Sequence, residues 1–353
     1  MIQWEDGYSS KWRLMAVNKF TWDSEYEVTG LSSVNIEHDM TDDYPLLETA
    51  TMEIDLPYEN GSFTSLPDGW YRVEMIADGY SGQSEKVDVA TLYLASESGH
   101  VERGYDRRSV NGYSVLKPAA GKKVEAGTYA PKGVNGAEHA AKLLRLCTPA
   151  PVVVEGSFTL NRHVVFDPAD SYLRCAWDLL DAAGWCMQID GHGRIHIREI
   201  AKTPKKNLSR IESCRKLEPG IDYKKDRSKI PNRYVAIYGS ERAVVENNDP
   251  ESPVSIPSRG FVIDEIDTSP VPVNGESLAH YAKRQLEDLS VIDERYSYYR
   301  EYDPDLMVFD SISYTMPDQM LSGEYRIVSQ SLACSHGIRV KETVSKQTKG
   351  YTA

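Results

Sequence analysis

Apolar and polar residues alternate through most of the first third of the chain. In LLETATMEIDLP the alternation places one set of side chains on each face of a strand. The apolar set is Leu46, Ala50, Met52, Ile54 and Leu56, and the polar set is Thr49, Thr51, Glu53 and Asp55. A period of two predicts a strand with one buried and one wet face. GWYRVEMIADG and EKVDVATLYLAS continue this pattern, and the turn signals ENGS, LPDG and DGYSG separate the segments.

The pattern changes to a helical period after residue 118. NGAEHAAKLLRLC and DPADSYLRCAWDLLDAAGW both place apolar residues on one helical stripe. In the second segment, Asp167 is placed as the N-cap, Pro168 as the first helical residue, and Gly184 just past the end. MQIDGHGRIHIRE follows, and its alternation around DGHG predicts a β-hairpin.

Strand patterns return from about residue 217, with one further helix among them. That helix is NGESLAHYAKRQLEDLS, and Asn274 is placed to cap its start. The strand-like segments are PNRYVAIYGSE, RGFVIDEID, ERYSYYREY, LMVFDSISYTMP, GEYRIVSQSLAC and GIRVKETVSKQ. The predicted fold class is therefore mainly β with an α+β insertion. We expect three parts: a β-domain at 1–118, an α+β module at 119–214 and a second β-domain at 215–353.

Composition and charge narrow the range of functions. The 353 residues include 22 tyrosines but only 6 phenylalanines, which favours sheet surfaces over a helical bundle. The formal net charge of −13 disfavours stable binding to nucleic acid or to anionic membranes. The first 20 residues lack the apolar segment of a signal peptide, and no stretch of about 18 apolar residues predicts a membrane span. We expect no stable membrane insertion and folding in the cytoplasm.

Cysteines and histidines give no sign of a metal or redox site. The five cysteines are scattered without a C-x-x-C pair, so buried free thiols are expected. His192 and His196 are four residues apart, a spacing that shares one metal ion on a helix. On an extended strand the same spacing separates the two residues by roughly 13 Å. The hairpin interpretation therefore places His192 in the turn and His196 on the polar face with Arg194 and Arg198, with no shared ion.

Other chemistry-bearing patterns are equally weak. The DEID segment at 264–267 clusters three carboxylates, but on a strand Asp264 points away from Glu265 and Asp267, so an exposed edge is expected. Phosphate-loop, nucleophile-elbow, zinc-protease and EF-hand patterns are absent. The 53 acidic residues leave open a glycosidase with two carboxylates, although no spacing singles out a pair. We predict no catalytic residue, no cofactor-binding residue and no metal ligand.

The order of these segments resembles the baseplate hub or tail-tip hub proteins of tailed bacteriophages, which also occur in contractile injection systems. The resemblance rests on GYSVLKPA closing the first β-domain, on SYLRCAWDLLDAAGW followed by the MQIDGHGRIHIRE hairpin, and on PNRYVAIYG. The capped helix and the last strands complete it, so that it spans about 20–345. One departure is that the Gly-Asp turn common in this family is replaced by VFDSIS, which keeps Asp310 without the glycine.

The resemblance implies an architecture and a set of partners. The segments 20–117 and 217–345 would be two tail-tube-like β-barrel or sandwich domains, with the helix-hairpin module peripheral to them. Three chains would form a pseudo-six-fold ring, joining the tail tube or a distal tail protein to the tip, spike or receptor-binding proteins. The location implied is the virion tail, and DNA would pass through the ring without sticking.

Two acidic residues are candidates for the wall of such a channel. Glu53 and Asp55 lie on the wet face of the 46–57 strand, and an acidic wall would repel phosphates. An ordinary solvated sheet face explains the same pattern. A tail protein that binds carbohydrate or a receptor through its tyrosines is an alternative function, and a cell-wall glycosidase is a second one.

Overall fold

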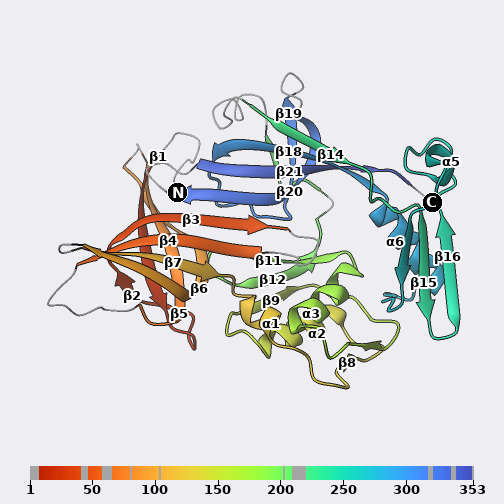
Figure 1. Cartoon of the computed structure of the whole chain (residues 1–353), viewed down its shortest axis with the longest axis horizontal. Coiled ribbons are helices and arrows are strands. Elements are labelled where there is room, and N and C mark those ends of the chain that lie inside the picture. Colours follow the sequence, from red (N-terminus) through yellow and green to blue (C-terminus); the bar gives the residue numbers. More distant parts are fainter. Residues whose placement is uncertain are drawn as a thin grey trace.

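A single large β-sheet forms the body of the molecule (Figure 1). The structure is a computed structural model and describes residues 8–40, 47–57, 66–79, 82–102, 105–201, 203–208, 220–316, 321–334 and 339–351. Leu46 and Cys214, both singled out from the sequence, lie outside these ranges, and so does the side chain of Leu56.

The first part of the chain forms seven antiparallel strands, three of which the alternating pattern predicts. They are β1 (Tyr8–Val17), β2 (Ser24–Val28), β3 (Leu31–Asp39), β4 (Leu47–Pro57), β5 (Gly69–Gly79), β6 (Ser84–Glu102) and β7 (Tyr105–Tyr113). Their buried faces pack on one another in a core that includes Leu14, Ile36, Met52, Val73 and Leu92. In β4, Ala50, Met52 and Ile54 are buried while Glu53 is exposed, which confirms the predicted faces of this strand at those positions.

The last part of the chain extends the same sheet. Its strands are β14 (Asp222–Asp226), β18 (Val291–Glu301), β19 (Ser311–Met316), β20 (Leu321–Cys334) and β21 (Arg339–Lys349). The order β14-β18-β21-β20-β3-β4-β7-β6-β5-β1-β2 joins both parts through β20 and β3, and the short β13 (Lys206–Leu208) pairs with β19. The antiparallel β20–β3 ladder runs from Ser329 opposite Asp39 to Cys334 opposite Val34.

The middle segment, called the middle module below, contains the predicted helix followed by the predicted hairpin. Its elements are α1 (Lys117–Gly121), β8 (Tyr129–Ala130), α2 (Gly136–Arg145), β9 (Val152–Glu155), β10 (Val164–Val165), α3 (Tyr172–Asp181), β11 (Trp185–Ile189) and β12 (Ile195–Glu199). Figure 1 shows it below the large sheet, with β11 and β12 between the sheet and the helices. One continuous core includes Leu173 and Leu179 of α3 together with Tyr298, Tyr314 and Ile327 of the last strands.

A small unit lies at the far end of the molecule from β2 (Figure 1). It contains β15 (Arg233–Tyr238), β16 (Glu241–Glu246), α5 (Ile256–Arg259), β17 (Asp264–Asp267) and α6 (Leu278–Leu289). β15 lies between β16 and β17, and α6 packs on one face of this sheet through Tyr281, Ala282 and Leu286. None of the described helices is long and apolar enough to cross a membrane.

Two helix starts differ from the prediction. Helix α3 begins at Tyr172 and is capped by Ser171, whose side chain accepts a hydrogen bond from the Arg174 amide. Asp167, the predicted cap, instead accepts a hydrogen bond from the Ala169 amide in a turn before the helix. Helix α6 is capped by Ser277 rather than Asn274, whose side chain accepts from the Thr159 amide. In both cases a serine directly before the apolar stripe is better placed than the polar residue further upstream.

Candidate functional site

A solvent-exposed face, called the wet face below, runs across both parts of the large sheet. One row of opposed residues on this face is Tyr299, Lys341, Ser331, Glu37, Thr49 and Tyr113, taken from β18 to β7. The next row is Glu301, Arg339, Ala333, Asn35, Thr51 and Asn111. Because the ladder is unbroken between β20 and β3, the face continues from one end of the chain to the other.

The predicted wall residues lie on this wet face. Glu53 stands between Ser33 of β3 and Ser109 of β7 and is exposed. Asp55 stands opposite Arg107, whose Nε donates to its carboxylate at 2.9 Å. A neighbouring cation therefore offsets the charge of Asp55, and hydroxyl groups surround Glu53. Glu37, Glu301, Lys341 and Arg339 belong to the same face, so its charge is mixed rather than purely acidic.

The turn of the β11–β12 hairpin docks onto the first part of the sheet. The Thr91 hydroxyl donates to the Gly191 carbonyl at 3.0 Å, and the His192 carbonyl accepts from Trp22 Nε1 at 2.7 Å and from Arg72 Nη2 at 3.2 Å. His192 Nδ1 lies 2.7 Å from an Asp88 carboxylate oxygen. We call Asp190–Arg194 the docking turn.

Glycine is required in the docking turn because the sheet backbone approaches it closely. A Cβ added at Gly191 would lie 1.7 Å from the Asp88 carbonyl oxygen, which is backbone and cannot rotate away. Gly193 has φ +80°, and a Cβ there would meet Thr91 at 2.7 Å. The DGHG sequence therefore serves both as a hairpin turn and as a contact surface.

The other side of the hairpin contacts the last part of the sheet through Asp310. This carboxylate is buried and accepts from Arg198 at 2.6 Å, from Lys205 at 2.8 Å and from Gln188 at 3.2 Å. Gln188 also donates to the Val308 carbonyl at 2.6 Å. Arg198 thus lies on the predicted polar face of the hairpin but points to a buried anion, and Cys186 is one of the expected buried free thiols.

Phe309 precedes Asp310 in a backbone conformation that favours glycine. Its φ is +75°, a region that costs a bulky residue about 1 to 3 kcal/mol. The Phe309 amide donates to the Ile327 carbonyl at 2.9 Å, and the ring is buried 6.3 Å from that of Trp177. This is the position at which VFDSIS lacks a glycine, and packing of the ring offsets the strain.

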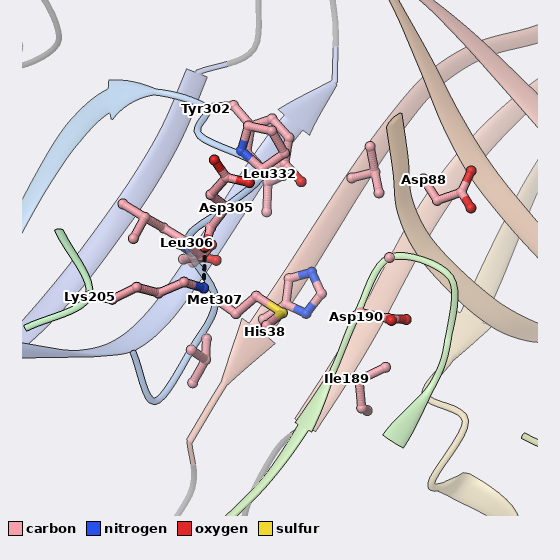
Figure 2. A pocket seen from close by; sticks show the side chains of 15 residues that line it. His38, Asp88, Ile189, Asp190, Lys205, Tyr302, Asp305, Leu306, Met307 and Leu332 are labelled. Carbon is pink, nitrogen blue, oxygen red and sulfur yellow. Dashed lines mark hydrogen bonds between the residues drawn. The ribbon is translucent and has the colours of Figure 1, made fainter. Parts of the chain in front are cut away.

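A cavity of about 250 Å³ lies where the docking turn, the two parts of the sheet and the segment after β18 meet. Figure 2 shows His38 and Met307 near Asp190 on one side, with Lys205 and Asp305 joined by a hydrogen bond on another. Gln330 and Leu332 of β20 contribute further lining. The groups are mixed in charge, and no reactive pair with a nucleophile and a base is formed among them.

Glu48 is a buried carboxylate next to this cavity. Only 1% of it is exposed, and neither carboxylate oxygen has a hydrogen-bond partner among the described residues. Burial, reinforced by the charge of Asp190, raises the pKa of Glu48 to about 8. His38 Nδ1 lies 3.4 Å from a Glu48 oxygen, and burial lowers the pKa of His38 to about 4. Both groups are therefore neutral near pH 7.

We expect replacement of Glu48 to change how stability depends on pH. Because the pKa of Glu48 is raised on folding, the folded chain retains a proton that the unfolded chain loses. The free energy of unfolding contributed by this group therefore falls as pH rises towards 8. His38 has the opposite effect below about pH 6.5, because burial lowers its pKa to about 4 on folding. Between about pH 6.5 and pH 8 the free energy of unfolding therefore falls by about 2 kcal/mol. Glu48→Gln should remove that part of the slope in denaturant unfolding curves.

The matched control is Glu53→Gln, which removes an exposed carboxylate from the same strand. His196 also titrates nearby, since hydrogen bonding to Asp190 raises its pKa against the effect of burial. It is unchanged in both variants, so the difference from wild type isolates Glu48. Equal slopes for wild type and Glu48→Gln would contradict the assignment of a buried neutral carboxyl.

The histidines and acids considered as metal ligands are engaged elsewhere. His192 pairs with Asp88, while His196 lies 2.9 Å from Glu155 and 3.1 Å from Asp190. Asp264 pairs with Arg233, while Asp267 accepts from the Tyr234 and Tyr281 hydroxyls. Among the residues that the structure describes, no three histidine, cysteine or carboxylate side chains form a group that could hold a metal ion.

The contacts that the sequence did not reveal are buried polar ones. Arg72 is 2% exposed and donates hydrogen bonds to Thr91, Ser24 and the Trp22 carbonyl. In the sequence it occupies a polar position of an alternating strand, which predicts a solvent-exposed side chain. Glu48 occupies the apolar face of LLETATMEIDLP, and this break in the alternation was the one available signal. Neither residue could be assigned without knowing which segments cover the sheet.

Comparisons with known proteins give a fold but no sequence relative. No protein-family model and no curated protein matches the chain significantly. The tail protein from Neisseria meningitidis MC58 superposes with a TM-score of 0.64 at 14% identity, covering 96% of this chain and 97% of that one. The 43 kDa tail protein of prophage MuSo2 from Shewanella oneidensis gives 0.62 at 11% identity, covering 97% and 99%.

A third likeness reaches beyond phages. The E. coli c3393 protein, described as a type VI secretion component similar to bacteriophage T4 tail proteins gp27 and gp5, has a TM-score of 0.52 at 9% identity, covering 92% of this chain and 75% of that one. These likenesses confirm the predicted fold class, mainly β with an α+β insertion. They also confirm, at the level of fold, the resemblance to tail and baseplate hub proteins.

Proposed function

We propose that the chain is a structural hub of a phage tail or baseplate. In this proposal three copies form a ring, in which the 20–117 and 217–345 segments act as tube-like units in approximate six-fold symmetry. The ring joins the tail tube or a distal tail protein to the tip or spike. The observation that carries the proposal is the unbroken wet face from β18 to β7, combined with a fold shared along nearly the whole length of tail proteins.

The proposed channel wall is the wet face that contains Glu53 and Asp55. Its serine, threonine and asparagine side chains offer DNA phosphates no fixed charge, and Arg107 is already paired with Asp55. A polymer passes such a surface without the counterion-releasing contacts that create affinity. Low adhesion would then follow from small polar groups, from the Arg107–Asp55 pair, and from Lys341 and Arg339 standing among Glu37 and Glu301, more than from net acidity.

The location and assembly can be tested directly. The mass of the purified chain in solution, measured over a range of concentrations, is expected to reach that of a trimer. Particles carrying a tagged chain should show the tag at the distal end of the tail in electron micrographs. A chain that stays monomeric and never joins tail components would contradict the proposal.

A non-enzymatic role is part of the proposal. Zymography on peptidoglycan should give no clearing, whereas a glycosidase would clear the gel. The carbohydrate-binding alternative relied on available tyrosines. Tyr296, Tyr298, Tyr314 and Tyr325 instead form a buried cluster, with rings 5.7 to 5.9 Å apart in successive pairs. Four others, Tyr26, Tyr129, Tyr223 and Tyr299, are 38% to 50% exposed, so binding of the isolated chain to intact cells is the measurement that would favour this alternative over the hub.

A further inference from the structure

The main run of the large sheet, from β14 to β2, ends in two strands that are each paired on one side, and the short β13 at the end of the side branch through β19 is a third such strand. Within the described residues, β14 pairs with β18 alone and β2 pairs with β1 alone. Both strands are five residues long, and most of their residues are exposed. An open edge presents unpaired backbone donors and acceptors, and it is a template for another strand. Figure 1 shows the two edges at opposite ends of the sheet.

The two edges carry opposite charge. The segment at β2 reads DSEYE from Asp23, with three carboxylates and no cation. The segment at β14 reads DYKKDRSK from Asp222, with four cations and two carboxylates. Each edge also presents a half-exposed tyrosine, Tyr26 at 49% and Tyr223 at 50%. Tyrosine is enriched in protein interfaces and among the residues that contribute most to binding.

Contacts within the chain leave part of this charge available. On β2, Glu27 pairs with Arg13 and Glu25 accepts from Asn18, so only one of the two has a cationic partner. On β14, Lys225 pairs with Glu294, while Lys224 is exposed and makes no ion pair among the described contacts. The central residue of β14 is therefore an exposed cation, and the centre of β2 lies between two carboxylates.

We propose that β14 of one copy pairs with β2 of the next copy, so that the large sheet continues from chain to chain. Contact between two different edges is heterologous, and it produces a closed ring when the rotation between copies closes. The proposal rests on the proposed ring function and deepens it by naming the surfaces that meet. It also covers both ends of the β14-to-β2 run at once, which a two-fold dimer through one edge would not do.

Charge reversal at one residue of each edge strand tests this pairing. Lys224→Glu and Glu25→Lys each place like charges across the interface, and we expect each to raise the trimer dissociation constant about tenfold or more. The double variant restores opposite charges, and its dissociation constant should return close to that of wild type. Lys283→Glu, on the exposed side of α6, makes the same change of charge away from both edges and should have no effect.

A cross-link provides an independent readout. Glu25→Cys combined with Lys224→Cys should form a disulfide between copies under mild oxidation, because paired strands bring the Cα atoms of opposed residues within bonding range. Wild type under the same oxidation reports any contribution from the native cysteines. If single charge reversals leave the trimer unchanged and no cross-link forms, the edge pairing is overturned while the hub proposal stands. If wild type does not form a trimer, both are overturned.

Discussion

Replacing Gly191 with alanine is expected to lower the free energy of unfolding by about 3 to 5 kcal/mol. The new Cβ would lie 1.7 Å from the Asp88 carbonyl oxygen and 2.3 Å from its carbon, so the backbone of the docking turn must move away from β6. That movement breaks the contacts that the Gly191 and His192 carbonyls make with Thr91, Trp22 and Arg72. Denaturant unfolding followed by tryptophan fluorescence measures the loss, since Trp22 is one of the partners.

Gly121→Ala is the matched control for this variant. Gly121 ends α1 with open space around its Cβ position, so the same addition of one methyl group should change stability by less than about 0.5 kcal/mol. Limited proteolysis supplies a second measurement, because an undocked turn should be cut faster than the wild-type turn. A Gly191→Ala protein as stable and as resistant as wild type would show that the turn does not hold the module to the sheet.

Replacing Glu342 with alanine is expected to cost a similar amount, about 3 to 5 kcal/mol, for a different reason. Glu342 is fully buried and accepts hydrogen bonds from Arg300, from Tyr298 at 2.7 Å and from Gln330 at 2.9 Å. Burial and the Glu342 charge raise the pKa of Tyr298, which keeps its hydroxyl a donor. Removal of the carboxylate leaves the Arg300 guanidinium buried without its counter-charge.

Two further variants separate charge burial from simple loss of an acid. Glu324→Ala removes an exposed carboxylate from β20 and should be close to neutral in thermal unfolding. Arg300→Met combined with Glu342→Leu removes both buried charges and should recover part of the loss, because no unpaired ion remains in the core. A double variant less stable than Glu342→Ala would show that the contribution of this pair is more than mutual neutralisation.

The elements and the fold class could be predicted because they depend on local patterns. Strict alternation identified β4 and β5, and the apolar stripes identified α3 and α6, while their caps were misplaced by a few residues. The hairpin at 185–199 followed from two short alternating runs around DGHG and is confirmed by its register, with Trp185 opposite Glu199. Each of these signals lies within a few neighbouring residues.

The contacts between distant segments could not be predicted in the same way. The pairing of β20 with β3 joins residues almost 300 positions apart, and nothing in the sequence of either strand identifies the strand it pairs with. The same holds for Asp310, which receives Arg198 and Lys205 from the middle module, and for Glu48, which looked like one polar residue in an apolar row. The assignment of Glu53 and Asp55 to a channel wall, and the two boundaries between the three predicted domains, stay predictions.

The continuous ladder through β20 and β3 also fixes geometry before any assembly takes place. Because the first and last parts of the chain share backbone hydrogen bonds, turning one part against the other would break a row of them. The middle module stabilises the same arrangement, because it contacts the first part of the chain through Gly191 and the last part through Asp310. In a ring of such chains, the angle between the first and last parts of each chain would be set during folding. Assembly would then have to select only the angles between neighbouring copies.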